Sequence, residues 1–447
     1  MTGGGGARRA AHALAATVLA ATGLAYVAPP LASAATSQPP PEPVRVLLVG
    51  DSVTQGSAGD WTWRYRLWQH LESVGAGVDL VGPRTDLYDN VADQHGSTAY
   101  ADPGFDRDHA ARWGMLLREP DVPLGELVET YRPDVVVEAR GLNDFVWVGA
   151  SAPETLDLVE DEVAEARAVD PDVDVVLTRL PQTWYDESAG GAITAYNAGL
   201  GDLAADLDTP QSRVVATATG SGFVQGEDTW DPAHLSAQGE VTMAAAVADA
   251  LAAVEVGAPY PRPLPVVRNG HWTPASLSAT AGDGVARLRW TSGPGVAREW
   301  VWVRDLTARR EWTRLSAPVP GPAWTAGGLV DGHTYAFRLQ GLKGSIAADR
   351  YSNTVRMAPV PPVPEAPARL RAALGKRSVR LSWGPARHAT SYAVWHRERA
   401  GWRRVAGTGR HAVTLPRPGR GVHRWRVRAW HDRVAGPWSR TVRVRVR

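Results

Sequence analysis

One short stretch near the N-terminus constrains the fold more than any other. The apolar, β-branched run Val44–Val49 ends abruptly at Gly50, Asp51 and Ser52. A run of this length bounded by turn residues is typical of a strand buried on both faces, as in a parallel sheet. The residues that follow, Asp60–Ser73, have a helical pattern. Ser52 is therefore expected just beyond the carboxyl end of a first strand, where open α/β sheets bind their ligands.

Strands and helices alternate through the rest of the N-terminal half. Further strands are predicted at Val78–Val81, Asp134–Ala139, Val173–Thr178 and Arg213–Ala216. Helices are predicted at Asp60–Ser73, Leu124–Tyr131, Pro153–Ala168, Ile193–Leu207 and Ala237–Val254. This alternation predicts a three-layer α/β/α domain over 44–256, with a parallel sheet in the flavodoxin-like order 2-1-3-4-5. The segment 82–123 has no clear element apart from what could be short helices, and we expect it to form a wall of the active-site cleft.

The N-terminus predicts export. An arginine pair precedes the apolar run Ala10–Val27, and Ala32–Ala34 supplies a small-residue cleavage pattern. Residues 1–34 are therefore predicted to be a secretory signal peptide, and a membrane anchor is the weaker alternative because the run is short and Ala-rich. Residues 35–43 are expected to be an extended, disordered leader. We expect a secreted, extracellular protein without a stable membrane span.

Composition excludes some chemistry. The 447 residues include no cysteine, which rules out disulfides, thiol nucleophiles and cysteine-ligated metals. Charge is unevenly distributed, because residues 366–447 carry 21 Lys and Arg against two acidic residues, a net charge of +19 in a chain whose total is +1. The rest of the chain is correspondingly acidic. Such an asymmetry bears on binding partners and not on fold.

Beyond residue 256 the pattern changes to short alternating strands. Pro-rich linkers at 257–271 and 359–366 flank two segments, 272–358 and 367–447, which look like a degenerate repeat of about ninety residues, a length that suits sandwich domains. The repeated motifs are Val285–Trp290 with Leu329–Tyr335 in the first segment and Ser378–Trp383 with Gly421–Trp425 in the second. Both segments resemble fibronectin type III modules, all-β immunoglobulin-like sandwiches. The second departs from the pattern because Trp425 stands where a Tyr is expected.

Two later stretches would lie near Ser52 in such a sheet. Gly141–Asp144 follows the third predicted strand, and Asp231–His234 precedes the last helix. With Gly50–Ser52, these stretches resemble the Gly-Asp-Ser, Gly-x-Asn-Asp and Asp-x-x-His blocks of the SGNH (GDSL) hydrolases over residues 44–256. Each block alone is a weak signal, and three in order on the expected elements are a strong one.

The resemblance implies a role for each of these residues. Ser52 would be the nucleophile, His234 the general base and Asp231 the carboxylate that orients it. The oxyanion hole would combine the Ser52 N–H, a glycine N–H from the long loop and the Asn143 side chain. For the loop glycine we predict Gly104, with Gly96 as the alternative.

The residue chemistry agrees with these roles. A serine hydroxyl needs a neighbouring base to attack an ester, histidine is suited to that task near neutral pH, and a carboxylate holds the histidine in one tautomer. Asp231 and His234 as metal ligands is a weaker interpretation, since no other His/Asp cluster accompanies them. No cofactor and no metal are expected. Predicted substrate contacts near the strand ends are Asp51, which could instead only brace the turn, Trp61, Trp147 and Trp184.

These features predict a secreted serine esterase that forms an acyl-enzyme and deacetylates a polysaccharide. Three observations favour carbohydrate: no long apolar lid, tryptophans for sugar stacking, and modules that resemble accessory parts of exported polysaccharide-degrading enzymes. A lipase or broad acyl esterase is the alternative enzyme, and a non-catalytic extracellular carbohydrate- or cell-surface-binding protein is the alternative class. In Arg424–Arg428 and Arg443–Arg447 the arginines alternate with apolar residues, which predicts a basic strand face that binds an anionic polymer. Nucleic acid is not an expected partner of an exported protein.

Overall fold

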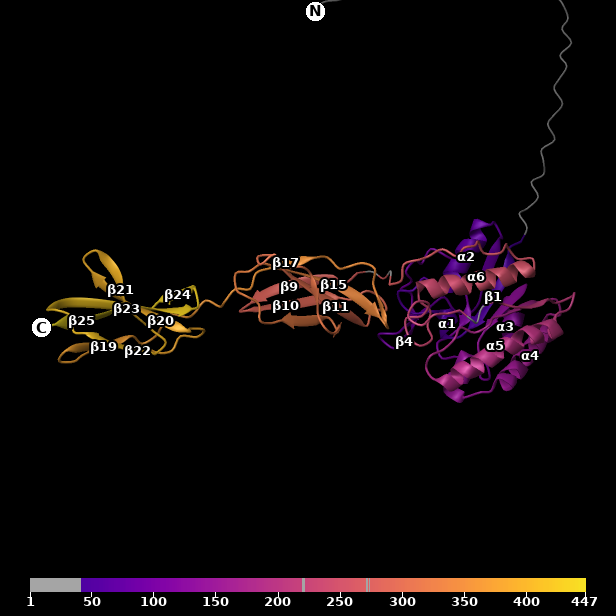
Figure 1. Ribbon diagram of the computed structural model, residues 1–447, viewed down its shortest axis with the longest axis horizontal. Coiled ribbons are helices and arrows are strands. Elements are labelled where there is room, and N and C mark those ends of the chain that lie inside the picture. The colour runs from indigo at the N-terminus through magenta and orange to yellow at the C-terminus, as the bar shows by residue number, and fades with distance from the viewer. Residues whose placement is uncertain (1–41, 219–221, 271, 273) are drawn as a thin grey trace, which may run out of the picture. The chain divides into compact units, whose positions relative to one another are not determined.

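Figure 1 shows the computed structural model, which describes residues 42–447 except 219–221, 271 and 273. The predicted signal peptide and nearly all of the predicted leader lie outside the described residues. The described elements belong to one compact unit, Pro43–Arg447. Within the described residues, no helix combines the length and the apolar character that crossing a membrane requires.

The α/β domain is built on a parallel sheet ordered β2-β1-β6-β7-β8, with the short strand β5 paired to the end of β1. Its strands are β1 (Val44–Gly50), β2 (Val78–Val81), β5 (Ala110–Ala111), β6 (Val135–Ala139), β7 (Asp174–Leu177) and β8 (Val214–Ala216). Its helices are α1 (Ser52–Gln55), α2 (Trp63–Ser73), α3 (Leu124–Tyr131), the π-helix η1 (Asp144–Val148), α4 (Ala152–Val169), α5 (Glu187–Leu207) and α6 (Ala237–Ala253). The predicted strand order, 2-1-3-4-5, is confirmed.

Strand β1 is buried on both faces, as predicted. Val46 and Leu48 belong to the core cluster that includes residues of α2 and α6, whereas Leu47 and Val49 face the opposite cluster with α3. Figure 1 shows helices on both sides of the sheet, with α2 and α6 on one side and α3, α4 and α5 on the other. The three layers leave the carboxyl ends of the strands as the edge where loops can form a site.

Two elements differ from the predictions. The segment 82–123 contains a short antiparallel pair, β3 (Leu87–Asp89) with β4 (Gln94–Ser97), and β5, instead of short helices. Helix α5 begins at Glu187, earlier than the predicted Ile193, because Asp186 caps it by accepting the Ala189 N–H at 2.7 Å. Two glycines in its first turns lower the local helix propensity, so the sequence pattern does not indicate that the helix begins this early.

The C-terminal part forms two all-β sandwiches, each of two antiparallel sheets. The first consists of β9 (Ser276–Gly282), β10 (Val285–Thr291) and β14 (Ala323–Ala326) against β11 (Arg298–Asp305), β12 (Thr313–Arg314), β13 (Val319–Pro320), β15 (Tyr335–Lys343), β16 (Ile346–Ala347) and β17 (Val355–Met357). The second consists of β18 (Arg371–Leu374), β19 (Ser378–Ser382) and β22 (Ala412–Pro416) against β20 (Ser391–Glu398), β21 (Gly401–Thr408), β23 (Gly421–His431), β24 (Val434–Trp438) and β25 (Val442–Val446).

The repeated motifs supply the cores of both sandwiches. Trp290 is buried in the first and Trp383 in the second, where Trp425 belongs to the same buried cluster. In the first sandwich the Tyr335 hydroxyl accepts the Val330 N–H at 3.0 Å, a hydrogen bond within the Leu329–Tyr335 motif. The predicted fold class, an α/β domain followed by two sandwiches, is confirmed.

Candidate active site

A tight turn at the end of β1 presents Ser52. Asp51 caps helix α1, and its Oδ1 accepts the Val53 N–H at 2.9 Å. A Cβ atom at Gly50 would lie 2.2 Å from Thr54 Oγ1, so only glycine lets α1 fold back this closely on the strand. Ser52 is the first residue of α1, where the N–H groups point away from the helix and have no partner within it.

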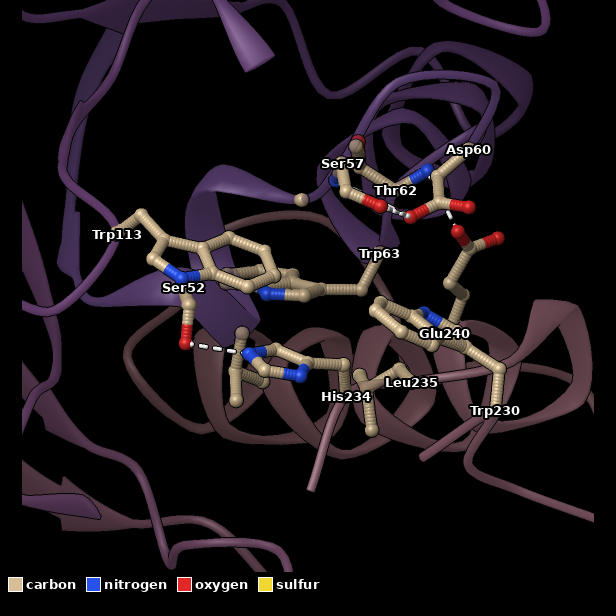
Figure 2. A pocket seen from close by; sticks show the side chains of 12 residues that line it. Ser52, Ser57, Asp60, Thr62, Trp63, Trp113, Trp230, His234, Leu235 and Glu240 are labelled. Atoms are coloured by element: carbon tan, nitrogen blue, oxygen red, sulfur yellow. Dashed lines mark hydrogen bonds between the residues drawn. The ribbon is translucent and has the colours of Figure 1, made fainter. Parts of the chain in front are cut away.

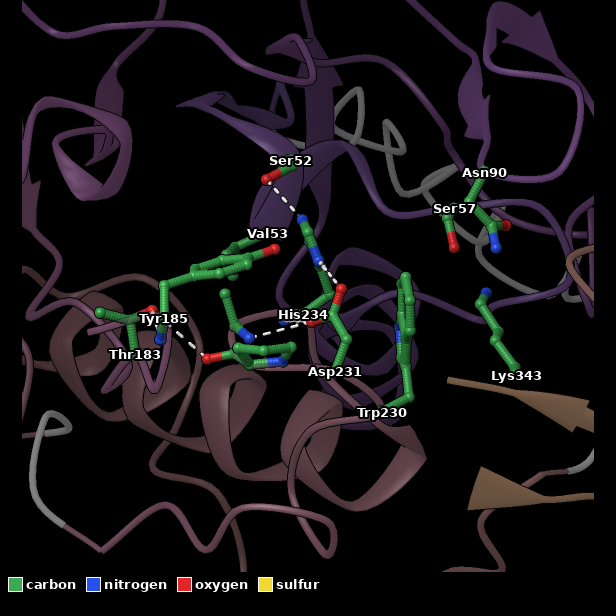
Figure 3. A network of polar contacts seen from close by, with 12 residues as sticks. Ser52, Val53, Ser57, Asn90, Thr183, Tyr185, Trp230, Asp231, His234 and Lys343 are labelled. Carbon is green, nitrogen blue, oxygen red and sulfur yellow. Dashed lines mark hydrogen bonds and ion pairs between the residues drawn. The ribbon is translucent and has the colours of Figure 1, made fainter. Parts of the chain in front are cut away.

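Ser52, His234 and Asp231 form a continuous chain of hydrogen bonds (Figure 3). His234 Nε2 lies 2.9 Å from Ser52 Oγ, and His234 Nδ1 lies 2.7 Å from Asp231 Oδ2. The other carboxylate oxygen, Asp231 Oδ1, accepts the backbone N–H groups of Ala233 and His234 at 2.9 and 2.7 Å. A proton held on Nδ1 by Asp231 leaves Nε2 as the acceptor for the Ser52 hydroxyl.

The carboxylate of Asp231 remains ionised in this position. Burial acts to raise the pKa of Asp231, but the hydrogen bond and charge attraction of His234 and the two backbone N–H donors outweigh it and lower the pKa below its ordinary value. An anionic Asp231 can therefore stabilise a protonated His234 ring.

Two indole rings stack on the His234 imidazole (Figure 2). The centroid of the His234 ring lies 4.1 Å from that of Trp113 and 5.1 Å from that of Trp230. Tyr88 continues the stack beyond Trp113 at 4.4 Å. The sequence reasoning missed these three rings, although Trp230 directly precedes the Asp231–His234 motif. Each ring can stabilise an imidazolium by about 0.5–2 kcal/mol.

Asn143 lines the same cleft as Ser52. Its side-chain Nδ2 donates to Met115 O at 3.0 Å, and its Oδ1 accepts the Trp147 indole N–H at 2.9 Å. These two bonds fix the orientation of the amide, which carries a second N–H on Nδ2. Trp147 is 67% exposed and lines the cleft, so the structure brings both of these predicted residues to the site.

The loop glycine in the cleft is Gly114, a correction to the prediction of Gly104. Gly114 lines the cleft with Ser52 and Asn143 and has a φ of 78°. Gly104 is exposed and does not line the cleft, and its backbone N–H donates to Asp102 Oδ1 at 2.9 Å. The alternative, Gly96, is also exposed and donates its N–H to a carboxylate, Asp86 Oδ2, at 2.8 Å.

The buried carboxylate of Asp144 holds the loop that carries Trp113 and Gly114. Asp144 Oδ2 accepts the Leu117 N–H at 2.7 Å, and its Oδ1 accepts from Arg118 Nε at 3.0 Å. The Asn143-Asp144 pair thus has two separate tasks. Asn143 faces the cleft, and Asp144 fastens the cleft wall to the end of β6.

Three other predicted substrate contacts lie elsewhere. Asp51 is fully buried beneath the turn, where burial raises its pKa to about 7, so it braces α1 and does not reach the cleft. Trp61 stacks under the Arg66 guanidinium, 4.4 Å from its ring centroid, and lines a separate small cavity. Trp184 packs against the core of the α/β domain, and its neighbour Tyr185 lines the cleft instead. Strand-end position alone could not distinguish the tryptophans that face the cleft from those that pack behind it.

The cleft has a volume of about 420 Å³ and is lined by aromatic and polar side chains. The predicted wall segment 82–123 contributes Tyr88, Asn90, Asp93, Trp113 and Gly114. The first sandwich contributes Ala297, Arg298 and Gly344, which was not predicted. In the described residues, no group of three or more His, Asp or Glu side chains is arranged to hold a metal ion.

No family model and no curated protein sequence matches this chain. Among solved structures, the N-terminal half is similar to an acetyl esterase mutant, S10A, with acetate ion: 25% identity, 47% of this chain and 97% of that chain covered, TM-score 0.40. It is also similar to a carbohydrate esterase family 3 protein from Talaromyces cellulolyticus: 26% identity, 47% and 97% covered, TM-score 0.40. The sandwich part is similar to a segment of two fibronectin type III domains from chicken tenascin: 15% identity, 39% and 100% covered, TM-score 0.27. The solved structures similar to this chain thus include esterases and fibronectin type III domains.

Proposed function

We propose that this protein is a serine carboxylic ester hydrolase of the SGNH (GDSL) type, with its catalytic residues within 44–256 and sandwich modules at 272–358 and 367–447. The observation that supports the proposal most is the chain Ser52 Oγ–His234 Nε2–His234 Nδ1–Asp231 Oδ2, with lengths of 2.9 and 2.7 Å, in a cleft that Asn143 also lines. Nucleophile, base and orienting carboxylate are within hydrogen-bond reach of one another.

The first half of the reaction transfers the acyl group to the protein. Ser52 Oγ attacks the ester carbonyl carbon, and its proton passes to His234 Nε2. The negative charge on the carbonyl oxygen is stabilised by the N–H groups of Ser52 and Gly114 and by Asn143 Nδ2. The carbon–oxygen bond to the alcohol then breaks, and the alcohol oxygen takes the proton from His234, which leaves an acyl-Ser52 ester.

The second half regenerates the serine. A water molecule gives a proton to His234 Nε2 as its oxygen attacks the acyl carbon. When the bond to Ser52 Oγ breaks, that oxygen takes the proton back from His234 and the carboxylic acid leaves. In both halves the imidazolium is stabilised by ionised Asp231 and by the stacked rings of Trp113 and Trp230.

We further propose an acetylated polysaccharide as the substrate. The cleft is lined by flat aromatic side chains and by hydrogen-bonding groups, a combination suited to sugar rings and their hydroxyls. Trp147 and Tyr185 lie side by side with centroids 5.8 Å apart, and Asn90 and Asp93 line the same cleft.

We also propose that the protein is exported and that it binds a polymer. Residues 1–34 would direct secretion, and the second sandwich would bind an anionic polymer through its basic strand face. Trp425 and Val427 on β23 are buried, whereas Arg424, which precedes them on the same strand, is exposed. Arg426 stacks between two indoles, 4.3 Å from Trp402 and 3.5 Å from Trp438. Binding of pectin that weakens strongly between low and high salt supports this role, and binding that is insensitive to salt contradicts it.

The activity is tested by comparing acetate release from acetylated xylan with hydrolysis of an octanoyl ester. The wild type is expected to prefer the acetyl ester. Ser52→Ala is expected to lose activity on both, and Ser188→Ala, an exposed serine in α5, to keep it. Activity retained by Ser52→Ala contradicts the serine mechanism. Preference for octanoate favours a lipase, and no hydrolysis by the wild type favours a binding protein.

A further inference from the structure

One wall of the cleft around Ser52 comes from outside the α/β domain. Three residues line the cleft together with Ser52 and His234: Ala297 directly before β11, Arg298 as its first residue, and Gly344 in the turn between β15 and β16. All three belong to the first sandwich. This module therefore contacts the space that a substrate would occupy, which an accessory domain tethered at a distance would not do.

A buried lysine fastens the sandwich to the α/β domain. Lys343, the last residue of β15, is 0% exposed, and its ammonium donates to Asp60 Oδ1 at 2.6 Å and to Ala58 O at 3.0 Å. Removing a lysine charge from water is costly unless it is paired and hydrogen-bonded, and here it is both. Asp60 Oδ2 in turn accepts from the Ser57 hydroxyl at 3.0 Å, so the carboxylate is held from both sides.

The turn between β15 and β16 contacts Trp230. The backbone N–H of Ser345 donates to Trp230 O at 2.7 Å, and the Lys343 ammonium lies 5.1 Å from the centroid of the Trp230 ring. A Cβ atom at Gly344 would lie 1.9 Å from Trp230 O, and the φ of 53° at Gly344 is one that favours glycine. An apolar cluster that includes Trp230, Trp272 and Ile346 surrounds this contact.

Trp230 connects this contact to the candidate triad. The Trp230 ring stacks on the His234 ring, with centroids 5.1 Å apart and planes inclined by 19°. The backbone N–H of Trp230 donates to His234 O at 2.9 Å. Trp230 is also the residue directly before Asp231. Figure 3 shows Lys343 and His234 on opposite sides of the Trp230 ring. The first sandwich thus holds both the ring and the backbone of the residue that positions the base.

We propose that the first sandwich contributes functional residues to the active site. Lys343 is a positioning residue that holds Trp230, and through it His234, in the reactive geometry. Arg298 forms the wall that contacts the alcohol part of the ester, the saccharide beyond the acyl group. This inference rests on the proposed esterase function and adds to it a division of tasks: Lys343 serves the chemical step, and Arg298 serves recognition of large substrates.

The two tasks are separated by steady-state kinetics on the full chain with two substrates, p-nitrophenyl acetate and acetylated xylan. Lys343→Met is expected to lower kcat about 10- to 100-fold on both substrates, because small displacements of a catalytic group carry losses of this size. Arg298→Ala is expected to raise KM several-fold for acetylated xylan only. Lys376→Met, an exposed lysine of the second sandwich, and Arg289→Ala, an exposed arginine on the other sheet of the first, are the matched controls and should behave as wild type.

A double-mutant cycle distinguishes positioning from general destabilisation. If Lys343 acts through Trp230, Lys343→Met added to Trp230→Leu should change kcat less than about twofold, whereas independent effects would multiply. Gly344→Ala displaces the same turn without changing charge and should also lower kcat, which provides the test if Lys343→Met does not fold. The proposal is overturned if both variants keep wild-type kcat while Ser52→Ala is inactive. Activity in Ser52→Ala would instead overturn the esterase mechanism itself.

Discussion

The imidazole of His234 lies face to face with the indole of Trp113, with ring centroids 4.1 Å apart and planes inclined by 14°. Trp113 comes from the long segment between β2 and α3, and His234 from the loop before α6. In the proposed mechanism, His234 becomes positively charged when Ser52 reacts, and the stack places an electron-rich ring face against it. We therefore expect the stack to stabilise the transition state more than the resting state.

Trp113→Leu tests this stack. Loss of about 0.5–2 kcal/mol of imidazolium stabilisation should lower kcat/KM roughly 2- to 30-fold on a small acetyl ester. Trp61→Leu is the matched control, because Trp61 stacks on Arg66 away from the cleft and its loss should change kcat/KM less than twofold. Equal effects of the two substitutions would mean that the stack has no specific part in catalysis.

Asn143→Ala removes a proposed oxyanion donor. Because that donor acts on charge that develops only during the reaction, kcat should fall about 10²- to 10³-fold while KM changes little. Steady-state kinetics on p-nitrophenyl acetate measure both constants. An unchanged kcat would exclude Asn143 from the oxyanion hole.

The two loop glycines give a paired comparison. Gly114→Ala should lower kcat several-fold, because alanine is strained at a φ of 78° and would shift the proposed oxyanion N–H of a residue that lines the cleft with Ser52 and Asn143. Gly104→Ala should leave kcat unchanged, since that residue is exposed and lies outside the cleft. The opposite result would restore Gly104 as the oxyanion glycine.

Asp51→Asn tests the buried carboxyl beneath Ser52. Burial raises the pKa of Asp51 from 3.8 to about 7, so between these values the unfolded chain has released a proton that the folded chain retains. Asp51 should therefore contribute a decrease in the free energy of unfolding as pH rises from about 4 to 7, and the Asp51→Asn substitution should remove this contribution. Relative to wild type, the variant should gain up to about 4 kcal/mol of stability between pH 4 and pH 8.

Differential scanning calorimetry at several pH values, following the unfolding transition of the α/β domain, measures this difference. The quantity to compare is the difference in the free energy of unfolding between the two proteins, and how this difference changes with pH. The substitution also alters the cap of α1, but this effect on the free energy of unfolding does not depend on pH. A difference that stays constant from pH 4 to pH 8 would show that Asp51 titrates normally in the folded protein.

The sequence predicted the features that depend on local pattern. The apolar run before Gly50 gave a strand buried on both faces, and the alternation of strands and helices gave the sheet order. Because parallel strands end at one edge of the sheet, the turn at Ser52 and the turn at Asn143 were expected together. Their proximity to His234 followed from the resemblance of three short motifs to one family.

The features that depend on long-range packing could not be predicted in this way. Nothing local distinguishes Gly104 from Gly114, since both are glycines in one long segment. Long-range contacts, among them the hydrogen bonds of Asp144 to Leu117 and Arg118, determine which part of the segment reaches the cleft. Trp147 and Trp184 both follow strand ends, yet one faces the cleft and the other the core. The contact between Lys343 and Asp60 joins residues 283 positions apart and has no signature in either segment.

The most direct test of the account is covalent labelling of the full chain with a fluorophosphonate, followed by peptide mass spectrometry. Such a reagent reacts with a serine that an adjacent base activates, and it needs no assumption about the natural substrate. We expect one adduct per chain, on Ser52, which is lost in His234→Ala although Ser52 is still present. An adduct on another serine, or labelling of Ser52 that is as fast in His234→Ala as in wild type, would contradict the proposed catalytic centre.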